Sequence, residues 1–366
     1  MHEMELHRLN MSKFMKKIEE KGFDIAFIAP GSDFYYLTGI RPGYTLERPF
    51  ILIITPRDYN LVVPALYKYE IENSWLKERV LIWRDGEDPF VFMKNIIKDM
   101  EVKRALIDDY MPAGILIKLI KLMPGVVIEP LSTVMSDLRA IKSELELQYI
   151  VEACRIVDHV FQELLEIDPR GKREKDIAKY IEKLIEEKGG EPCFSPLVAY
   201  GANAANPHHV SGNELIRDNN VLILDYGARY NGYCSDITRT VFIGDVSNEI
   251  KEVYKIVLDA HDLGVEYVRE GVYAEDIDSV VRNYITKHGY GDNFIHRTGH
   301  GLGLDVHEDP YIAPGNKTVL RNGMVFTIEP GIYINGKFGV RIEDDVAIIG
   351  NKGVLLTRSS REMITL

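Results

Sequence analysis

The sequence is poor in cysteine, in basic residues and in long apolar runs, and each shortage excludes a class of protein. Its three cysteines, Cys154, Cys193 and Cys234, are odd in number and lack CxxC spacing. This argues against a disulfide framework or a structural zinc site and predicts a reducing, cytoplasmic location. With 56 acidic against 44 basic residues and a net charge of −12, the chain lacks the basic surface that nucleic acids and anionic membranes require. No apolar run is long enough to cross a bilayer.

The remaining composition is that of a folded protein. Hydrophobic residues make up 46% and charged residues 27% of 366 residues, and this length suggests two domains. Lysine and glutamate are abundant, and Gln148 and Gln162 are the only glutamines, which indicates a thermophilic source. Residues 1–20 are amphipathic and mixed in charge, unlike a signal peptide.

The first part of the chain alternates helical and strand patterns. Helical periodicity runs from Met4 to Lys21 and stops at Gly22, a common residue after a helix. Short apolar strands are predicted at residues 24–29, 50–54, 60–63, 80–83 and 104–107. Helices are expected at residues 65–74, 89–100 and 112–123. This alternation predicts a small α/β domain with a mixed sheet over residues 1–133.

Residues 134–366 are expected to form a larger α+β domain. Residues 131–141 form a short amphipathic connector, and Ser143 with Glu146 makes a capping-box pattern that opens a helix over residues 144–167. Further helices are predicted at residues 173–188, 249–268 and 274–288, with strands and hairpins between and after them. Two helices plus strands then occur twice, which is compatible with a weak internal symmetry.

A β-hairpin that carries two acids is predicted over residues 221–243. Asn231-Gly232 separates its apolar strands and favours a two-residue turn. In that register Asp225 lies opposite Thr238, and Asp225 and Asp236 share one face, with Cβ atoms roughly 7 Å apart. Such a spacing suits two carboxylates that share a pair of cations.

Buried acids on one face require a partner. Gly227, opposite Asp236, is expected to leave open space beside that acid, and Arg229 could neutralise one of the two carboxylates. No basic residue of this face can neutralise both, so a cation is the better explanation. A register slip of one residue would separate the acids onto opposite faces.

A second pair of acids, Glu329 and Glu343, lies in the last β-rich stretch. The two face each other only if the loop between their strands is odd in length or carries a bulge, so a loop longer than a tight Asn335-Gly336 turn is predicted. Arg341 then shares a face with Glu343, because alternate residues of a strand point the same way.

Histidines supply the remaining candidate ligands. His300 stands between glycines that allow close approach of backbone and substrate, and His296 and His307 lie nearby. A dinucleotide-binding loop is disfavoured there, because no apolar strand precedes the glycines. A loop histidine, His208 or its neighbour His209, could stabilise charge on a substrate carbonyl or carboxylate. His261 and His288, on predicted helices, are expected at the surface.

Four carboxylates and one imidazole are a suitable ligand set for two divalent cations. The sequence alone therefore favours a metal-assisted hydrolase built on Asp225, Asp236, His300, Glu329 and Glu343.

These segments resemble the signature segments of the pita-bread metallopeptidases, in the same order along the chain. They are Leu224–Gly227, Ser235–Thr240, Gly299–Gly303, Thr327–Gly331 and Val340–Asp344. The N-terminal segment Phe34–Gly39 is similar to that of the proline-specific branch, which includes prolidases and aminopeptidases P.

The resemblance implies a C-terminal pita-bread domain behind a smaller α/β domain, two divalent ions per subunit, and a homodimer. Mn²⁺ or Co²⁺ is expected, with Zn²⁺ or Fe²⁺ as alternatives. Asp225 would bind one ion, Asp236 and Glu343 would bridge both, and His300 and Glu329 would bind the second.

The resemblance also implies roles in cleaving a bond to proline. Glu329 would carry a proton from water to the proline nitrogen, and His208 and His307 would donate hydrogen bonds to the substrate carbonyl. Arg341 would orient Glu343 or the substrate. The proline ring would lie against His296, with Tyr311 and Phe194 as apolar walls.

The expected reaction is hydrolysis of Xaa-Pro dipeptides. Prolidases often carry a basic residue shortly after the motif histidine, where this chain has Tyr311. His208, His296, Arg297 or a residue of a partner chain would then bind the substrate carboxylate. The alternatives are an aminopeptidase P, which acts on longer peptides, and a non-catalytic binding protein of the same fold.

Overall fold

The computed structural model describes residues 3–42 and 47–366. The chain divides into two compact units between Leu138 and Arg139, inside the helix α6 (Ser132–Ala140). The boundary placed after residue 133 from the sequence falls in the same helix, and the expected connector is helical. Over the described residues, no helix has both the length and the apolar character that a membrane span needs.

The N-terminal unit contains one mixed six-stranded sheet in the order β4-β3-β2-β1-β5-β6. β1 pairs antiparallel with β2, and β2 with β3, whereas the other neighbours are parallel. The strands are β1 (Ile25–Ile28), β2 (Ile51–Ile54), β3 (Tyr59–Pro64), β4 (Val80–Trp83), β5 (Arg104–Ile107) and β6 (Val127–Pro130). The five predicted strands are all present. The missed sixth, β6, is a partly exposed edge strand and has a weak sequence pattern.

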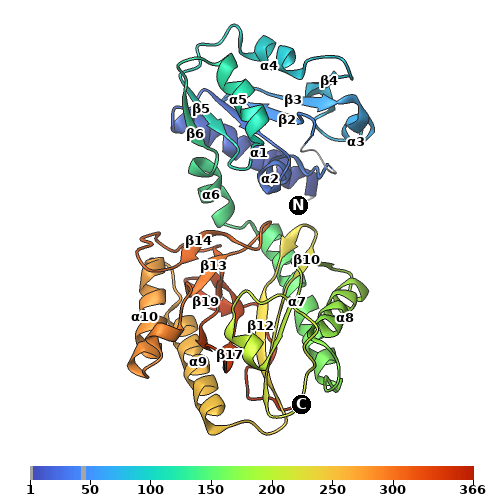
Figure 1. The fold of residues 1–366 in the computed structure, drawn as a ribbon. Helices are drawn as coiled ribbons and strands as arrows, with labels where there is room; N and C mark the ends of the chain where they lie inside the picture. The colour runs from blue at the N-terminus through green and yellow to red at the C-terminus, as the bar shows by residue number, and fades with distance from the viewer. Residues whose placement is uncertain (1–2, 43–46) are drawn as a thin grey trace. The chain divides into compact units, whose positions relative to one another are not determined.

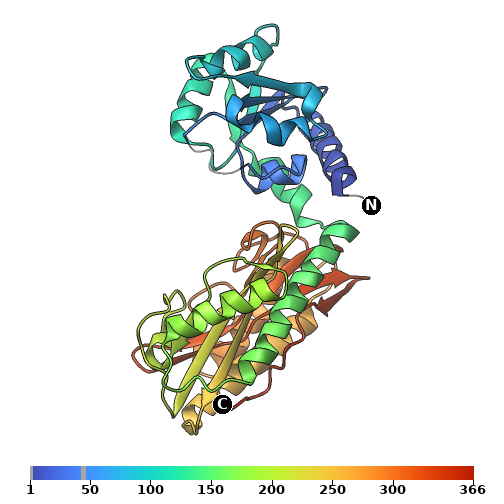
Figure 2. The ribbon, with the colours of Figure 1, turned by 90° about the vertical axis from the view of Figure 1, so that its right-hand side faces the viewer.

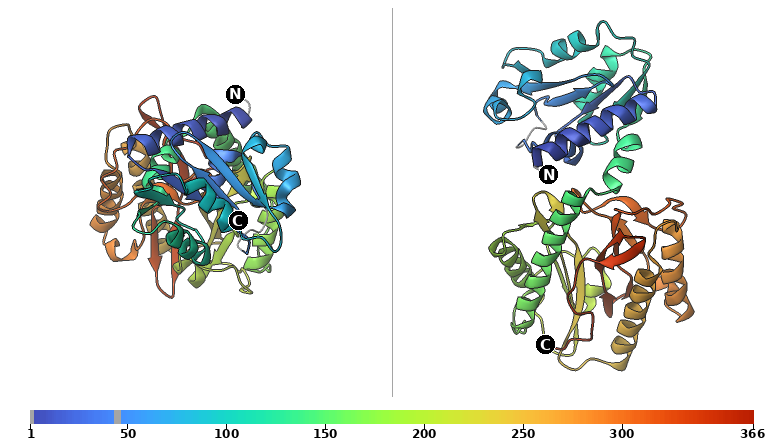
Figure 3. Two further views of the ribbon diagram at one scale, coloured as in Figure 1. Left: turned by 90° about the horizontal axis from the view of Figure 1, so that it is seen from above. Right: turned by 180° about the vertical axis from the view of Figure 1, so that it is seen from behind.

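Helices cover both faces of this sheet (Figure 1). The helices are α1 (Glu3–Glu20), α2 (Ser32–Thr38), α3 (Lys68–Glu72), α4 (Pro89–Ile97) and α5 (Ala113–Leu122), with short 3₁₀ turns η1 (Ala65–Tyr67) and η2 (Lys77–Arg79). The apolar stripes of α4 and α5 pack with Ile25, Phe27 and Ile51, and α1 lies along the other face (Figure 3). α1 ends before Gly22, whose φ of 71° suits a residue without a Cβ.

The C-terminal unit is built around two main sheets, β12-β9-β8 and β14-β13-β15-β18-β19, and also contains the smaller sheets β11-β10-β7 and β16-β17. The strands of its first half are β7 (Glu191–Pro192), β8 (Leu197–Tyr200), β9 (Asn220–Tyr226), β10 (Ala228–Tyr230), β11 (Tyr233–Cys234) and β12 (Ile237–Ile243). Those of its second half are β13 (Gly299–Gly301), β14 (Glu308–Ile312), β15 (Val325–Ile328), β16 (Gly331–Ile334), β17 (Phe338–Arg341), β18 (Asp344–Ile349) and β19 (Lys352–Leu355).

Two helix pairs flank these strands (Figure 1). They are α7 (Glu144–Leu165) with α8 (Glu174–Glu187), and α9 (Asn248–Tyr267) with α10 (Ala274–Lys287); η3 (Gly201–Ala205) and η4 (Gly291–Asn293) are 3₁₀ turns. All four long helices lie where the sequence predicts them. The predicted capping box at α7 is confirmed, with Ser143 accepting from the Glu146 amide and the Glu146 carboxylate accepting from the Ser143 amide.

Strand β9 shows how the core places an acid between two layers. Leu222 and Leu224 pack against α7 and α8, whose pair lies across the strands in Figure 2. Val221 and Ile223, which point to the opposite face, pack in the α9 cluster. Asp225 continues that second face because side chains alternate along a strand. The carboxylate therefore points toward the other half of the unit.

Candidate metal centre

The first acidic hairpin has the predicted register. Asp225 pairs with Thr238, and Tyr230 pairs with Tyr233 across the two-residue turn. The expected open space at Gly227 is wrong, because a Cβ there would lie 2.2 Å from the Ser235 carbonyl oxygen. Glycine is required at this position because the opposite strand comes close where β9 gives way to β10.

The second pair of acids also has the predicted parity. Ile334 pairs with Phe338 and Gly331 with Arg341, so three residues, 335–337, form the loop. The Lys337 amide donates to the Ile334 carbonyl oxygen, so Gly336 is the second central residue of a turn, and its φ of 72° is one that glycine adopts readily. Continued by two residues, this register sets Glu329 opposite Glu343, at the point where the chain passes from one sheet to the next.

His300 reaches the acids from β13, whose backbone lies very close to its neighbours. A Cβ on Gly299 would lie 1.8 Å from the Thr327 carbonyl oxygen, and one on Gly301 would lie 2.3 Å from that of Asp309. The His300 Nε2 atom is 3.4 Å from Glu329 Oε1 and 3.8 Å from Asp236 Oδ2. The glycines beside His300 are therefore needed for close backbone packing.

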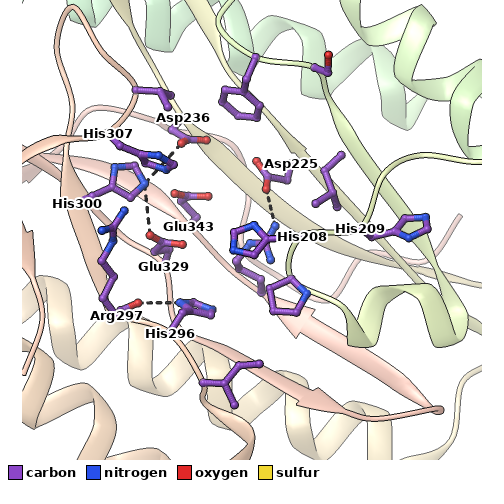
Figure 4. Close-up of a pocket in the computed structure, with 17 residues that line it drawn as sticks. His208, His209, Asp225, Asp236, His296, Arg297, His300, His307, Glu329 and Glu343 are labelled. Carbon is purple, nitrogen blue, oxygen red and sulfur yellow. Dashed lines mark hydrogen bonds and ion pairs between the residues drawn. The ribbon is translucent and has the colours of Figure 1, made fainter. Parts of the chain in front are cut away.

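The structure brings the five candidate ligands into one pocket of about 720 Å³ (Figure 4). Ligand atoms of Asp236, His300 and Glu343 lie within 4.8 Å of one another. Asp225 and Glu329 line the same pocket. Residues from three hairpins, far apart in sequence, therefore converge on a volume that can hold cations.

The electrostatics of this cluster leave a deficit of positive charge. Burial first, and then the neighbouring carboxylates, raise the pKa values of Asp236 and Glu343 well above their usual range. Burial also raises the pKa of Glu329 to about 7. The Asp236 Oδ1 atom is buried and has no hydrogen-bond partner among residues 3–42 and 47–366. Divalent cations would supply the missing charge and satisfy this oxygen, so the residues fit a metal centre.

His300 is suited to the same centre because burial, and then His307, hold its pKa well below the ordinary value. A neutral imidazole presents a lone pair to a metal. Its ring packs edge-to-face on that of His307, with centroids 4.2 Å apart.

Arg341 is a cation that pairs directly with one of these acids. Its guanidinium pairs with Asp225, donates to Tyr333 Oη at 2.9 Å and donates through Nε to Thr238 Oγ1 at 3.1 Å. Thr238 in turn donates to Glu343 Oε2 at 2.6 Å. Arg341 was expected to act on Glu343 or on substrate; Thr238 links its guanidinium to Glu343 by hydrogen bonds, and its charge lowers the pKa of Glu343 against the larger effect of burial.

Arg229, the other cation considered for these acids, donates to the carbonyl oxygens of Gly232 and Leu304. The sequence analysis did not predict that Thr238 links Arg341 to Glu343. The predicted hairpin register nevertheless placed Thr238 opposite Asp225, so the sequence contained a signal for this residue. Tyr333 carried no comparable signal, because its contact with Arg341 depends on the three-residue loop.

The other predicted site residues divide into those that line the pocket and one that does not. His208, His296, His307 and Phe194 line it. Burial, followed by Arg341, lowers the pKa of His296 to about 4, and its Nε2 atom lies 2.9 Å from Tyr333 Oη. Tyr311 is not among the lining residues; instead its ring stacks with Arg297, whose Cζ lies 4.3 Å from the ring centroid. Its expected role as a wall of the proline pocket stays a prediction.

Behind the centre lies a buried ion cluster that the sequence did not reveal. Asp344 Oδ1 lies 2.6 Å from Arg239 Nη2, and Asp344 Oδ2 lies 3.0 Å from His261 Nε2. His261 is fully buried, so its expected surface position is wrong; His288 is exposed as expected. The helix pattern at α9 did not show that one of its polar residues faces a buried acid.

The cysteines also differ from expectation. Cys193 and Cys234 form a disulfide with Cα atoms 6.0 Å apart, whereas the free Cys154 is buried. Cys234 lies in β11 and Cys193 follows β7, and both strands pair with β10, so this shared neighbour brings the two cysteines together. A separation of 41 residues without a motif gave no sign of the pairing.

Comparison with known proteins agrees with this geometry. Residues 148–349 match the model of metallopeptidase family M24, and residues 11–141 match the creatinase/prolidase N-terminal domain. A Xaa-Pro dipeptidase of Pyrococcus horikoshii is 36% identical, over 99% of this chain and 100% of that relative.

Two solved structures extend the comparison. A prolidase from Thermococcus sibiricus is 47% identical and superposes with a TM-score of 0.94, over 98% of this chain and 99% of the other. An X-Pro aminopeptidase from Thermotoga maritima is 29% identical with a TM-score of 0.81, over 96% of this chain and all of the other. The pita-bread domain, the N-terminal domain and the convergent acids together show that this chain is a metal-dependent peptidase and belongs to metallopeptidase family M24.

Proposed function

We propose that this enzyme hydrolyses the Xaa-Pro bond of dipeptides. The similarity to a Xaa-Pro dipeptidase and to a prolidase over nearly the whole chain supports this substrate class. The choice between dipeptides and longer peptides rests on one further observation: Arg297 lines the pocket and forms no ion pair with an acid of the described residues. A dipeptidase must bind the free carboxylate that follows the scissile bond, and a peptidase for longer chains has no such requirement.

Arg297 provides a cation for that carboxylate. It is one of two arginines that line the pocket, and the other, Arg341, is already paired with Asp225. Across residues 3–42 and 47–366, no acid forms an ion pair with Arg297, and its guanidinium instead stacks on Tyr311. The stacked ring fixes the guanidinium and leaves its N–H groups free for a planar carboxylate.

Arg297 is also close to the candidate catalytic groups. After burial, it contributes most to the lowered pKa of His307, and it opposes the raised pKa of Glu329. Figure 4 shows it on the His300 side of the pocket. A dipeptide held by its carboxylate at Arg297 would thus present its imide bond toward the acids. A longer peptide has no carboxylate at this position and would leave the Arg297 guanidinium unpaired.

The five ligands, Asp225, Asp236, His300, Glu329 and Glu343, would hold two divalent cations, with Mn²⁺ or Co²⁺ preferred and Zn²⁺ or Fe²⁺ as alternatives. When bound, such ions polarise a carbonyl and lower the pKa of a coordinated water.

The chain's own residues would then move the protons. Glu329 accepts a proton from the attacking water and delivers it to the proline nitrogen, which needs one to leave. His208 and His307 donate hydrogen bonds to the carbonyl oxygen as negative charge develops there. His307 can donate as a neutral ring, because burial, followed by Arg297, lowers its pKa. Arg341 fixes Asp225 and, through Thr238, Glu343.

Selection of proline requires walls but no backbone acceptor, because the imide has no N–H. His296, Ile295 and Phe194 line the pocket and provide ring and apolar surfaces for the pyrrolidine. We also propose a homodimer and a cytoplasmic location. The Cys193–Cys234 disulfide is compatible with the latter in a hyperthermophile, whose intracellular proteins form such bonds.

The test compares a Xaa-Pro dipeptide with the tripeptide that has one residue added after proline, using enzyme loaded with Mn²⁺ or Co²⁺. We expect kcat/KM to favour the dipeptide at least tenfold. Arg297→Gln should lower kcat/KM for the dipeptide by roughly 10- to 100-fold, since a hydrogen bond to a charged group is worth about 1.5–3 kcal/mol. The same variant should leave the tripeptide nearly unchanged.

Equal cleavage of both peptides by the wild-type enzyme would identify the activity as that of an aminopeptidase P, the alternative that the similarity to the Thermotoga enzyme supports. A metal-loaded protein that cleaves neither peptide would contradict both.

A further inference from the structure

Glu174 is a buried carboxylate that belongs to neither the metal centre nor the hydrophobic core. It is the first residue of α8, and its side chain is 0% exposed. A charged group so placed needs several donors to be stable. The donors that it finds come from one segment of the chain, residues 200–212.

Four hydrogen bonds converge on this carboxylate. Oε1 accepts from the Tyr200 amide at 2.8 Å and from Asn203 Nδ2 at 2.9 Å. Oε2 lies 2.8 Å from His209 Nε2 and accepts from the Gly212 amide at 3.0 Å. Burial opposes ionisation, but these bonds together lower the pKa of Glu174 below its ordinary value. It is therefore an ionised acceptor at neutral pH.

The segment that Glu174 holds carries His208. Apart from the short η3 turn, residues 201–212 have no regular secondary structure, so neither helix nor sheet fixes the loop that follows the turn. The His208 amide donates to Asn206 Oδ1 at 3.1 Å, and its side chain is exposed to the pocket that it lines. In Figure 4 His208 points toward Asp225 while His209 points away from the centre.

The two neighbouring histidines therefore have different roles: His209 holds the loop, and His208 faces the pocket. His209 anchors to the buried carboxylate, and its neighbour is thereby turned to the pocket. The four donors lie on both sides of His208 in the sequence, so one carboxylate closes the loop around it. Loss of one acceptor oxygen would remove the hydrogen bonds to the loop on one side of His208.

We propose that Glu174 is a positioning residue that sets the His208 side chain for the reaction through the loop of residues 200–212. The inference rests on the proposed role of His208. An acid that merely stabilised the first turn of α8 would act equally well without these four contacts. The chain contains such an acid for comparison: Asp176, two residues later, accepts from the Arg173 amide at 3.3 Å, as a capping group does.

The experiment is a double-mutant cycle of Glu174→Gln and His208→Ala on the metal-loaded enzyme, with Asp176→Asn as the matched control. The Gln amide nitrogen donates and cannot accept, so at least one of the four bonds is lost. We expect His208→Ala to lower kcat about 100-fold, and Glu174→Gln to lower it about tenfold with KM within twofold of wild type. In the His208→Ala background, Glu174→Gln should have no further effect on kcat. Asp176→Asn should leave kcat unchanged.

A second measurement does not depend on the substrate. Amide hydrogen exchange of the peptide spanning residues 200–212 should accelerate at least tenfold in Glu174→Gln and stay at the wild-type rate in Asp176→Asn. Multiplicative losses of kcat in the double variant, or unchanged exchange in Glu174→Gln, would overturn the proposal. If the wild-type enzyme cleaves no Xaa-Pro peptide, the proposed function fails, whereas the exchange result still decides whether Glu174 holds the loop.

Discussion

Two groups of buried acids in the C-terminal unit behave in opposite ways. At the metal centre, burial and mutual repulsion raise the pKa values of Asp236 and Glu343. Elsewhere in this unit, burial is outweighed at Asp344 by Arg239 and His261, and at Glu308 by Arg139 and Lys142, so both pKa values are lowered. The second group is neutralised by the protein's own cations, and the first is not.

This difference in neutralisation distinguishes acids that stabilise the fold from acids that are suited to bind a ligand. A buried acid with cations of its own contributes to the fold, and its partners would suffer from its loss. A cluster of acids with too few cations is unfavourable in the folded protein unless ligands bind there, which is the condition for a metal centre. Burial alone does not distinguish the groups, because Asp236 and Asp344 are both almost fully buried.

The largest expected effect comes from Asp236→Asn. Loss of a ligand close to both His300 and Glu343 should reduce kcat/KM by roughly a thousandfold or more, while the metal-free variant should be more stable than metal-free wild type. The neutral amide removes one of four mutually repelling acids, and about 1 kcal/mol or more should be gained at pH 8. Urea unfolding in the presence of a chelator measures this. Lower stability of the metal-free variant would refute the view that these acids repel one another.

Asp344→Asn is expected to lower the stability of the protein, whereas Asp236→Asn raises that of the metal-free form. Arg239, whose side chain is 1% exposed, would lose its buried counter-charge, and a loss of about 3–5 kcal/mol in the free energy of unfolding follows. The loss should occur with and without metal, because Asp344 is turned away from the ligands toward Arg239 and His261. Chemical unfolding of both forms tests this. A variant as stable as wild type would show that the two groups of acids do not differ as described.

Metal-free wild-type protein should become less stable as pH rises from about 5 to 8. The folded pKa of Glu329 is raised to about 7, above its unfolded value, so the folded state binds more protons across this window and stability falls with pH. About 1.4 kcal/mol per pKa unit gives on the order of 3 kcal/mol near pH 8. Scanning calorimetry at several pH values measures it, and saturating Mn²⁺ should flatten the dependence. A rising Tm over this window would contradict the assignment.

The smallest effect is expected for an exposed ion pair, which serves as a control for the buried acids. Lys16 and Glu20 form a pair one helical turn apart, with side chains 78% and 53% exposed, and solvent screens such pairs. Glu20→Gln should leave the unfolding midpoint unchanged within error at any pH between 5 and 8. A measurable shift would mean that the protein's overall charge, and not burial, governs the pH response of the acids at the centre.

Much of the fold follows from local pattern. The long helices have strong apolar periodicity and clear caps, as at Ser143 and Gly22, and they lie where predicted. The register of the first hairpin follows from Asn231-Gly232, and the odd loop of the second follows from requiring Glu329 to face Glu343. What failed were features without a local pattern, including the edge strand β6 and the Cys193–Cys234 disulfide.

The sequence by itself determined the chemistry of the centre, because four acids and an imidazole in apolar hairpins are few enough and unusual enough to be recognised without coordinates. Only the tertiary structure decided how those acids are held. It placed Arg341 on Asp225, Tyr311 beneath Arg297 and Glu174 at the loop of His208. Such contacts depend on where separate segments meet in space, and a periodicity of two or 3.6 residues carries no information about that.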